Sequence, residues 1–251
     1  MIKTNSILIA VIVIMLSGCV TTKYNAGFKT EEKTKSERLE TKIKIALQYV
    51  NLGEPSRALS VLREEQKKNA NDPALNEALG LVFQKTKEYA LANQHFQKAL
   101  KYNPKYTRGR NNYAVFLYEA GSYRESCQQL EIVTRDVYYE NRSNAYSNMG
   151  LCYLKLGNVA RAKQSYVKSL QLQPDNAQSL LELAHLQYQV KDLARAQKNL
   201  KTFHMLVPKG VARSLSLGYK LATRLGRSSE ASIYKQALKR LYPTSKEARS
   251  L

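Results

Sequence analysis

The feature of this sequence that most restricts its fold is a repeat of 34 residues that covers most of the chain. Units begin at residues 39, 73, 107, 143, 177 and 211, with one two-residue insertion, Asn141-Arg142. The eighth position of every unit is small: Ala46, Gly80, Ala114, Gly150, Ala184 and Gly218. Such a period is typical of arrays in which each unit packs on its neighbours. We therefore expect a single repeat array.

Small and bulky residues recur inside each unit at the spacing of two packed helices. Two helices approach closely only where small residues meet and bulky neighbours fill the surrounding space. Position 20 is small in five units and Glu230 in the sixth. Position 24 is bulky throughout: Leu62, Phe96, Leu130, Tyr166, Leu200 and Tyr234. Prolines lie near unit boundaries or in a turn, where they interrupt no helix. The pattern predicts an all-α protein with two antiparallel helices per unit.

These units resemble the tetratricopeptide repeat (TPR). Residues 80–106, GLVFQKTKEYALANQHFQKALKYNPKY, and residues 145–176 are close to its consensus. The resemblance implies a TPR solenoid, a right-handed superhelix of six antiparallel helix pairs with a concave face lined by the first helix of each pair. The expected repeats are 39–72, 73–106, 107–140, 143–176, 177–210 and 211–244, followed by a tail over 245–251 without a clear capping helix.

The N-terminus predicts an exported, lipid-anchored protein. Residues 7–16, ILIAVIVIML, follow Lys3 and make a helix of about 15 Å, half the ~30 Å of a bilayer core. This is typical of a signal-peptide core. Leu16-Ser17-Gly18-Cys19 resembles a bacterial lipobox, which implies a signal peptide over 1–18 and a lipidated Cys19; the alternative is an uncleaved short anchor. The residue after the cysteine is Val20, and the absence of Asp there resembles lipoproteins sorted to the outer membrane, which implies a location on its periplasmic face. The polar residues 19–38 are expected to form a flexible linker.

The chain carries 40 Lys and Arg against 20 Asp and Glu, a formal charge of +20. This balance suggests anionic partners, but export excludes nucleic acid in practice. Residues 191–251 hold 14 Lys and Arg against three acids, so a basic C-terminal end is a candidate contact for an acidic protein or envelope surface. The alternative is a set of solvated outer-face residues.

No sequence pattern nominates an active site. P-loops, G-x-S-x-G and HExxH are absent, and none of the three histidines has a partner at ligand spacing, so we expect no enzyme, no cofactor, no metal and no small-molecule substrate. Cys127 and Cys152 lie on helices expected to pack together. They are candidates for a disulfide, since an oxidising periplasm permits one. The alternative is two buried free thiols.

The concave face is the expected site for a partner segment, because one side of each first helix faces it. Asparagine offers both a donor and an acceptor to a peptide backbone, and arginine grips a carboxylate with two parallel bonds. Asn112 and Asn148 stand where the general repeat pattern also has asparagine, so their alternative role is structural. The candidate partner-binding residues are Arg108, Asn111, Asn112, Asn144, Ser147, Asn148, His185, Tyr188 and Tyr219.

Several segments resemble one family beyond the generic repeat, the type IV pilus biogenesis and stability proteins PilW/PilF, which are pilotins. They are NNYAVFLYE (111–119), YENRS (139–143), ARSLSLGYKLA (212–222) and LKRLYPTS (238–245). The resemblance implies a lipoprotein that binds a subunit of the pilus secretin and aids its outer-membrane localisation and multimerisation. The alternatives are a lipoprotein scaffold for outer-membrane protein insertion or peptidoglycan enzymes, and a basic module that binds anionic glycan or lipid.

Overall fold

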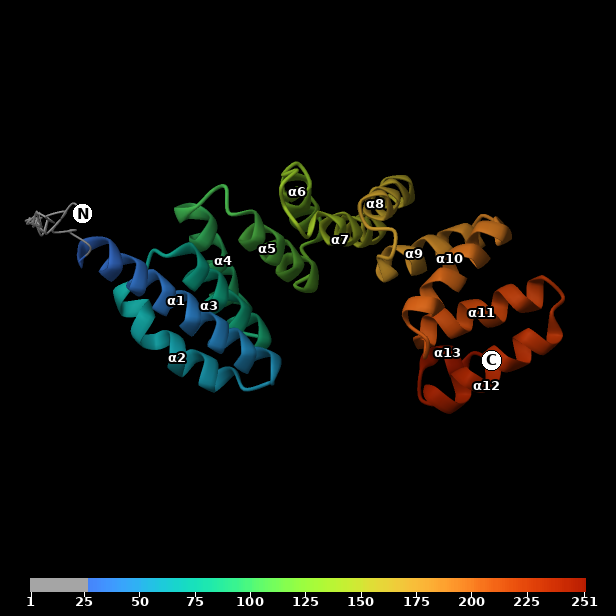
Figure 1. The fold of residues 1–251 in the computed structure, drawn as a ribbon. Coiled ribbons are helices and arrows are strands. Elements are labelled where there is room, and N and C mark those ends of the chain that lie inside the picture. The colour runs from blue at the N-terminus through green and yellow to red at the C-terminus, as the bar shows by residue number, and fades with distance from the viewer. Residues whose placement is uncertain (1–26) are drawn as a thin grey trace, which may run out of the picture. The chain divides into compact units, whose positions relative to one another are not determined.

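The computed structural model describes residues 27–251, with side chains from residue 34 onward. Leu39–Leu251 form one compact unit. Every regular element in the described part is a helix (Figure 1). The helices are α1(Gly27–Asn51), α2(Pro55–Lys68), α3(Pro73–Lys85), α4(Tyr89–Tyr102), α5(Thr107–Glu119), α6(Tyr123–Val133), α7(Arg142–Lys155), α8(Val159–Leu172), α9(Ala177–Gln189), α10(Leu193–Leu206), α11(Ala212–Arg224), α12(Ser228–Leu241) and α13(Lys246–Arg249).

Consecutive helices pack in pairs, and each pair packs on the next. In Figure 1 the partners α11 and α12 run side by side, as do α3 and α4. The second helix of one pair then contacts the first helix of the following pair, as α6 contacts α7 and α8 contacts α9. This arrangement confirms the predicted all-α TPR solenoid.

Volume is matched where the two helices of a pair cross. A Cβ added to Gly80, Gly150 or Gly218 would meet the ring of an aromatic residue 16 positions later, namely Phe96, Tyr166 or Tyr234. In the alternate pairs the small residue is alanine and the later residue is leucine, and both belong to one buried cluster. Those pairs are Ala46 with Leu62, Ala114 with Leu130, and Ala184 with Leu200. Glycine therefore accompanies an aromatic ring, and alanine accompanies leucine.

The turns inside the pairs need a left-handed residue. Gly121 and Gly157 supply it with φ of 85° and 75°, which glycine adopts without steric cost. Lys87 and Lys191 hold the equivalent place in their pairs with φ of 64° and 63°. A residue with a Cβ is uncommon there, so these two turns carry some backbone strain.

The second helix of the last pair begins one residue later in the repeat than the other second helices do. Ala231, and not Glu230, is the buried small residue of α12, because α12 begins at Ser228. The departure of Glu230 from the small residues at position 20 is thereby explained. The tail also differs from expectation, since residues 246–249 form the short helix α13. Its Ala248 is buried against Leu215 and Leu238.

The connection between α6 and α7 is longer than the others. It spans residues 134–141, whereas residues 103–106 suffice between α4 and α5. α6 is correspondingly short, with 11 residues against 14 in α4 and α8. The two inserted residues thus lie at the end of this connection and the start of α7, and they break no helix.

The expectation of a flexible linker over 19–38 is wrong for its described part. α1 begins at Gly27, so residues 27–38 are helical. Their lysines and glutamates are good helix formers, and no proline interrupts them. The signal peptide over 1–18 and Cys19 lie outside the described residues. Within residues 27–251 no helix has the length and apolar character needed to cross a membrane.

Candidate functional site

The first helices of successive pairs contact one another and form one face of the array. α3 packs on α5, α5 on α7, α7 on α9, and α9 on α11, and we call this surface the first-helix face. All nine candidate partner-binding residues lie on α5, α7, α9 or α11. Eight of the side chains fall into three groups, which either link neighbouring repeats, lack a partner, or pack beneath a cation, and the ninth, Asn148, lines a cavity.

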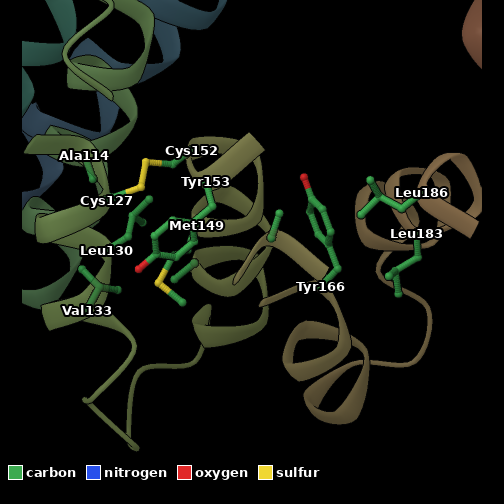
Figure 2. Close-up of a cluster of buried hydrophobic side chains, with 12 residues drawn as sticks. Ala114, Cys127, Leu130, Val133, Met149, Cys152, Tyr153, Tyr166, Leu183 and Leu186 are labelled. Atoms are coloured by element: carbon green, nitrogen blue, oxygen red, sulfur yellow. A yellow bond between two sulfur atoms is a disulfide. The ribbon is translucent and has the colours of Figure 1, made fainter. Parts of the chain in front are cut away.

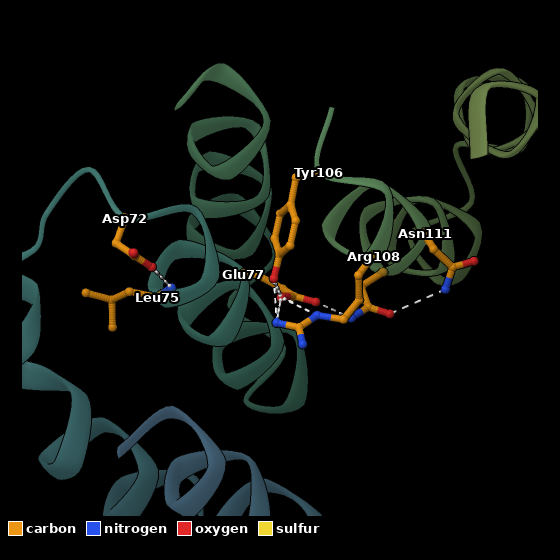
Figure 3. Close-up of polar contacts among 7 residues, drawn as sticks. Asp72, Leu75, Glu77, Tyr106, Arg108 and Asn111 are labelled. Atoms are coloured by element: carbon orange, nitrogen blue, oxygen red, sulfur yellow. Dashed lines mark hydrogen bonds and ion pairs between the residues drawn. The ribbon is translucent and has the colours of Figure 1, made fainter. Parts of the chain in front are cut away.

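Glu77 of α3 organises the first group (Figure 3). Its carboxylate is buried, with 2% of the residue exposed, and it accepts from Arg108 Nη2 at 2.9 Å and Asn112 Nδ2 at 2.6 Å. The Tyr106 hydroxyl also donates to it. Burial and the carboxylate raise the pKa of Tyr106, so its proton stays in place. Burial alone would lower the pKa of Arg108, but Glu77 and Tyr106 outweigh it and raise that pKa.

A second buried carboxylate repeats this arrangement between α9 and α11. Arg213 donates to both oxygens of Glu182, from Nη1 at 2.6 Å and from Nη2 at 3.1 Å. The hydrogen bond to Glu182 raises the pKa of Arg213. The separation along the chain is 31 residues, the same as between Glu77 and Arg108. This shared spacing is a sequence signal for both ion pairs that our sequence analysis missed.

Asn144 also links neighbouring repeats. Its Oδ1 accepts from Asn176 Nδ2 at 2.8 Å, and Asn176 caps α9 through its own Oδ1. Arg108, Asn112 and Asn144 therefore hold repeats together, and the side-chain groups they use for this are not free for a partner segment.

A second group of polar atoms on this face has no partner. Among the described residues, Asn111 Oδ1, Ser147 Oγ and His185 Nε2 are buried and unpaired, as is Gln84 Oε1 of α3. Burial, with a further contribution from Arg213, lowers the pKa of His185 to about 4, so the ring is neutral near pH 7. Buried polar groups without partners are uncommon, and four of the five in the described residues lie on first helices; the fifth is Tyr166 Oη on α8.

An apolar cavity opens one helical turn along α5 and α7 from Asn111 and Ser147, where Val115 and Leu151 line it. It measures about 210 Å³ and lies among α5, α6 and α7. Val115, Tyr118, Leu130 and Leu151 contribute its apolar walls, and the candidate residue Asn148 is at its edge. Sites for drug-sized ligands are usually about 300–1,000 Å³, so this cavity suits a single apolar side chain.

The two tyrosines form the third group. The Arg224 guanidinium lies 5.1 Å from the ring centre of Tyr188, and the Lys235 ammonium lies 6.0 Å from that of Tyr219. Arg224 is on α11 and Lys235 is on α12. Tyr188 thus reaches the next repeat, whereas Tyr219 turns toward the second helix of its own pair. The structure does not bring these two rings to the cavity.

Cys127 and Cys152 are bonded in the structure, with Cα atoms 5.7 Å apart (Figure 2). The bond joins α6 to α7 inside a buried cluster that includes Leu130 and Met149. It closes a separation of 25 residues, which corresponds to about 3.5 kcal/mol of stabilisation in the chain-entropy account. Mass spectrometry of the unreduced protein isolated from its native host tests the pairing, which two free thiols would contradict.

The described residues offer no metal centre, because no three His, Cys, Asp or Glu side chains gather there in a way that could hold an ion. What the first-helix face provides is an apolar cavity with unpaired hydrogen-bonding atoms. That chemistry suits recognition of a polypeptide segment.

The comparisons with known proteins agree with the helix-pair architecture. Residues 77–131 and 143–176 match the tetratricopeptide repeat family. A solved structure from a functional characterisation of Pseudomonas aeruginosa PilF superposes with a TM-score of 0.80, at 33% identity over 86% of this chain and 97% of that one. PilW, described as a widely conserved type IV pilus biogenesis factor, superposes with a TM-score of 0.74, at 25% identity over 84% of this chain and 96% of that one.

The fold and the first-helix face therefore define a protein of the tetratricopeptide repeat class, whose members bind other proteins. The type IV pilus assembly protein PilF of Pseudomonas aeruginosa is 33% identical over 240 residues, which is 96% of this chain and 94% of that protein. This chain belongs to the PilF/PilW family of type IV pilus biogenesis proteins.

Proposed function

We propose that this chain is a pilotin of the type IV pilus. In this proposal Cys19 carries the lipid that anchors the protein to the periplasmic face of the outer membrane. The repeat array binds a subunit of the pilus secretin and promotes its localisation and multimerisation there. Membership of the PilF/PilW family supports the pilus assignment, and the lipobox-like residues 16–19 support the anchor.

The observation that carries the binding part of the proposal is the apolar cavity between α5 and α7, with the unpaired atoms of Asn111 and Ser147 one helical turn away on those two helices. Asn111 and Ser147 occupy the same position on the adjacent helices α5 and α7, whose axes are expected to lie about 8–10 Å apart. An extended chain rises about 3.3 Å per residue, so roughly three residues cross from one helix to the other. Such a segment places one apolar side chain in the cavity and its backbone N–H groups near Asn111 Oδ1 and Ser147 Oγ.

The anchor makes modest affinity sufficient. Confinement to one membrane raises the local concentration of the array around secretin subunits that arrive there, so successive binding events become nearly intramolecular. Several acyl chains on one cysteine give durable attachment, since a single chain binds only marginally.

Filling the cavity tests the binding site. Val115→Trp places a large ring in it, and Val167→Trp is the matched control on α8, where Val167 is exposed and does not line the cavity. We expect Val115→Trp to reduce co-purification of the secretin by about tenfold or more, as lost anchor contacts do, with both variants folded by circular dichroism. Unchanged co-purification by Val115→Trp would move the site away from the cavity.

Removing the protein or its anchor tests the biological role. Deletion of the gene should abolish surface pili and SDS-resistant secretin multimers, and Cys19→Ala should keep the array folded while the secretin fails to reach the outer membrane. Normal multimers in a clean deletion contradict the proposal. Recovery of outer-membrane insertion factors or peptidoglycan enzymes in place of the secretin would favour the scaffold alternative.

A further inference from the structure

A second cavity lies on the opposite side of α7 from the first-helix face. α7 contributes Tyr146, Met149 and Tyr153 to this cavity, whereas its Asn148 and Leu151 face the apolar cavity. Residues two apart on a helix point about 200° from each other, so the two cavities use opposite sides of α7. The second cavity measures about 480 Å³ and lies among α6, α7 and α8. We call it the basic cavity.

The charged side chains around the basic cavity are mostly cationic. Its lining includes Arg135, Arg142, Arg161 and Lys168, against a single acid, Glu131. Glu131 is 3.7 Å from Arg161 and accepts from the Tyr153 hydroxyl. Within residues 34–251, neither Arg135 nor Lys168 forms an ion pair. The cavity therefore presents a net positive charge that the array itself does not neutralise.

Two of the cations are held in position by the protein. The Arg142 guanidinium lies 5.6 Å from the ring centre of Tyr146, and its Nε donates to the Thr134 carbonyl at 2.8 Å. The Arg161 guanidinium lies 5.4 Å from the ring centre of Tyr153. The remaining guanidinium N–H groups of Arg142 stay available to a carboxylate. Positioned arginines of this kind lose less entropy on binding an anion.

The two-residue insertion contributes to this cavity. Asn141-Arg142 is the only interruption of the 34-residue period, and Arg142 is one of the lining cations. The lengthened connection also exposes apolar side chains next to Arg135, with Tyr138 exposed by 91% and Val137 by 63%. The insertion and the connection before it thus supply two lining cations, Arg142 and Arg135, with two exposed apolar side chains between them along the chain.

We propose that the basic cavity is a second binding site, for an acidic segment of a partner protein that carries an aromatic or aliphatic side chain among its carboxylates. The cations match carboxylates, and the floor of Tyr146, Met149 and Tyr153 matches the apolar side chain. A phosphate or lipid headgroup would use the cations alone and leave the apolar floor unused. The site is independent of the first-helix face.

A labelled peptide tests this site directly on purified full-length protein. The probe has four glutamates around one phenylalanine, and its control peptide carries glutamines in their place. We expect fluorescence anisotropy to show binding of the acidic peptide that weakens with added salt, and no binding of the amide peptide at millimolar concentration. NMR shifts at Tyr146, Met149 and Tyr153 should accompany binding. No binding of the acidic peptide, or equal binding of both peptides, would overturn the proposal.

A matched pair of variants separates the site from general charge. Arg135→Gln with Lys168→Gln removes two lining cations, and Arg124→Gln with Lys163→Gln removes two exposed cations of α6 and α8 that do not line the cavity. Peptide affinity should fall about tenfold in the first variant and less than threefold in the second. Equal losses of peptide affinity in the two variants would overturn the proposal. A second contrary result would be that the first variant alone loses retention on anionic vesicles while its peptide affinity stays unchanged, because that would assign the cations to a lipid surface.

Discussion

Two buried carboxylates, Glu77 and Glu182, tie neighbouring repeats together through arginines that follow them by 31 residues. Each carboxylate sits on a first helix, and its arginine belongs to the first helix of the next pair. A buried ion pair adds little net stability, but removal of one partner leaves a buried charge without compensation. The arginine at each junction therefore matters more for the stability of the fold than its partly exposed position suggests.

Replacement of Arg213 tests this asymmetry. We expect Arg213→Met to lower the free energy of unfolding by about 3 kcal/mol, because the Glu182 carboxylate keeps its buried position and loses its partner. Urea denaturation measures the change. Arg195→Met is the control, since Arg195 pairs with Asp192 at an exposed site and should change stability by less than about 0.5 kcal/mol. The double variant Glu182→Met with Arg213→Met should recover most of the loss.

His185 predicts a dependence of stability on pH. Its folded pKa of about 4 lies below the value of 6.5 for a free histidine, so the unfolded chain binds the proton first as the pH falls. Stability from this group is complete above pH 6.5 and is lost progressively toward pH 4. Burial also lowers the pKa values of His95 and His204, which act in the same direction.

We expect His185→Gln to reduce the loss of unfolding free energy between pH 7 and pH 5 by about 1–2 kcal/mol. Chemical denaturation at both pH values measures it. Equal pH dependence in the variant and the parent protein would show that His185 does not control this window.

The sequence was sufficient to place the candidate residues on their helices, but it did not show which of their side chains already have partners. Repeat position identified the helices that carry them, and all nine lie on first helices. Position alone did not show that Arg108, Asn112 and Asn144 are engaged by the next repeat, because their partners are 31 to 35 residues away along the chain. It also missed the apolar cavity, which depends on how α5, α6 and α7 approach one another.

Where the two helices of a pair cross, the space between them is filled in one of two ways. Gly150 accepts the ring of Tyr166, and Ala114 accepts Leu130 at the equivalent crossing of the preceding pair. The combined volume is similar, so the two residues depend on each other. A change of one without the other produces either overlap or a void.

A double substitution tests this dependence. Gly150→Ala alone should destabilise the protein by about 1–3 kcal/mol, because the new Cβ overlaps the Tyr166 ring. Tyr166→Leu alone should also destabilise it, through the space that the ring leaves. The two together reproduce the Ala114 and Leu130 combination, and we expect the loss to be less than about 1 kcal/mol. Thermal denaturation of the three variants measures the coupling, and additive losses would contradict it.

The helix boundaries were predictable where proline, glycine and the repeat agree, and less so at the two ends of the chain. Residues 27–38 lack an apolar period, yet their propensity extends α1 through them. α13 has only four residues, and its formation depends on burial of Ala248 against α11 and α12. Neither end could be read from periodicity, because one depends on local propensity and the other on tertiary contact.

For the whole molecule, the pattern of contacts between neighbouring repeats was predictable from the 34-residue period. Each pair contacts mainly the pair before it and the pair after it, so stability is approximately a sum over pairs and their junctions. A change at one end should therefore stay local. The cavities and the disulfide add features that the period alone does not contain.

Removal of residues 245–251 tests this locality. The truncation uncovers Leu215 and Leu238, which pack on Ala248 in the intact chain. We expect amide hydrogen exchange in α11 and α12 to accelerate by about tenfold or more, while exchange in α3 and α4 is unchanged. Mass spectrometry of exchanged peptides resolves the two regions. Faster exchange throughout the array would show that it unfolds as one cooperative unit.

The alternation of glycine with an aromatic ring and alanine with leucine has a consequence for how such a chain can change over generations. Conversion of one crossing type into the other requires two substitutions, and either intermediate is less stable than both end points. A chain that changes one residue at a time would therefore pass through a destabilised form before it reaches the other crossing type. The two types follow each other in strict order along the chain, so the packing at the crossings has a period of two repeats, 68 residues without the insertion, twice the period of the sequence pattern.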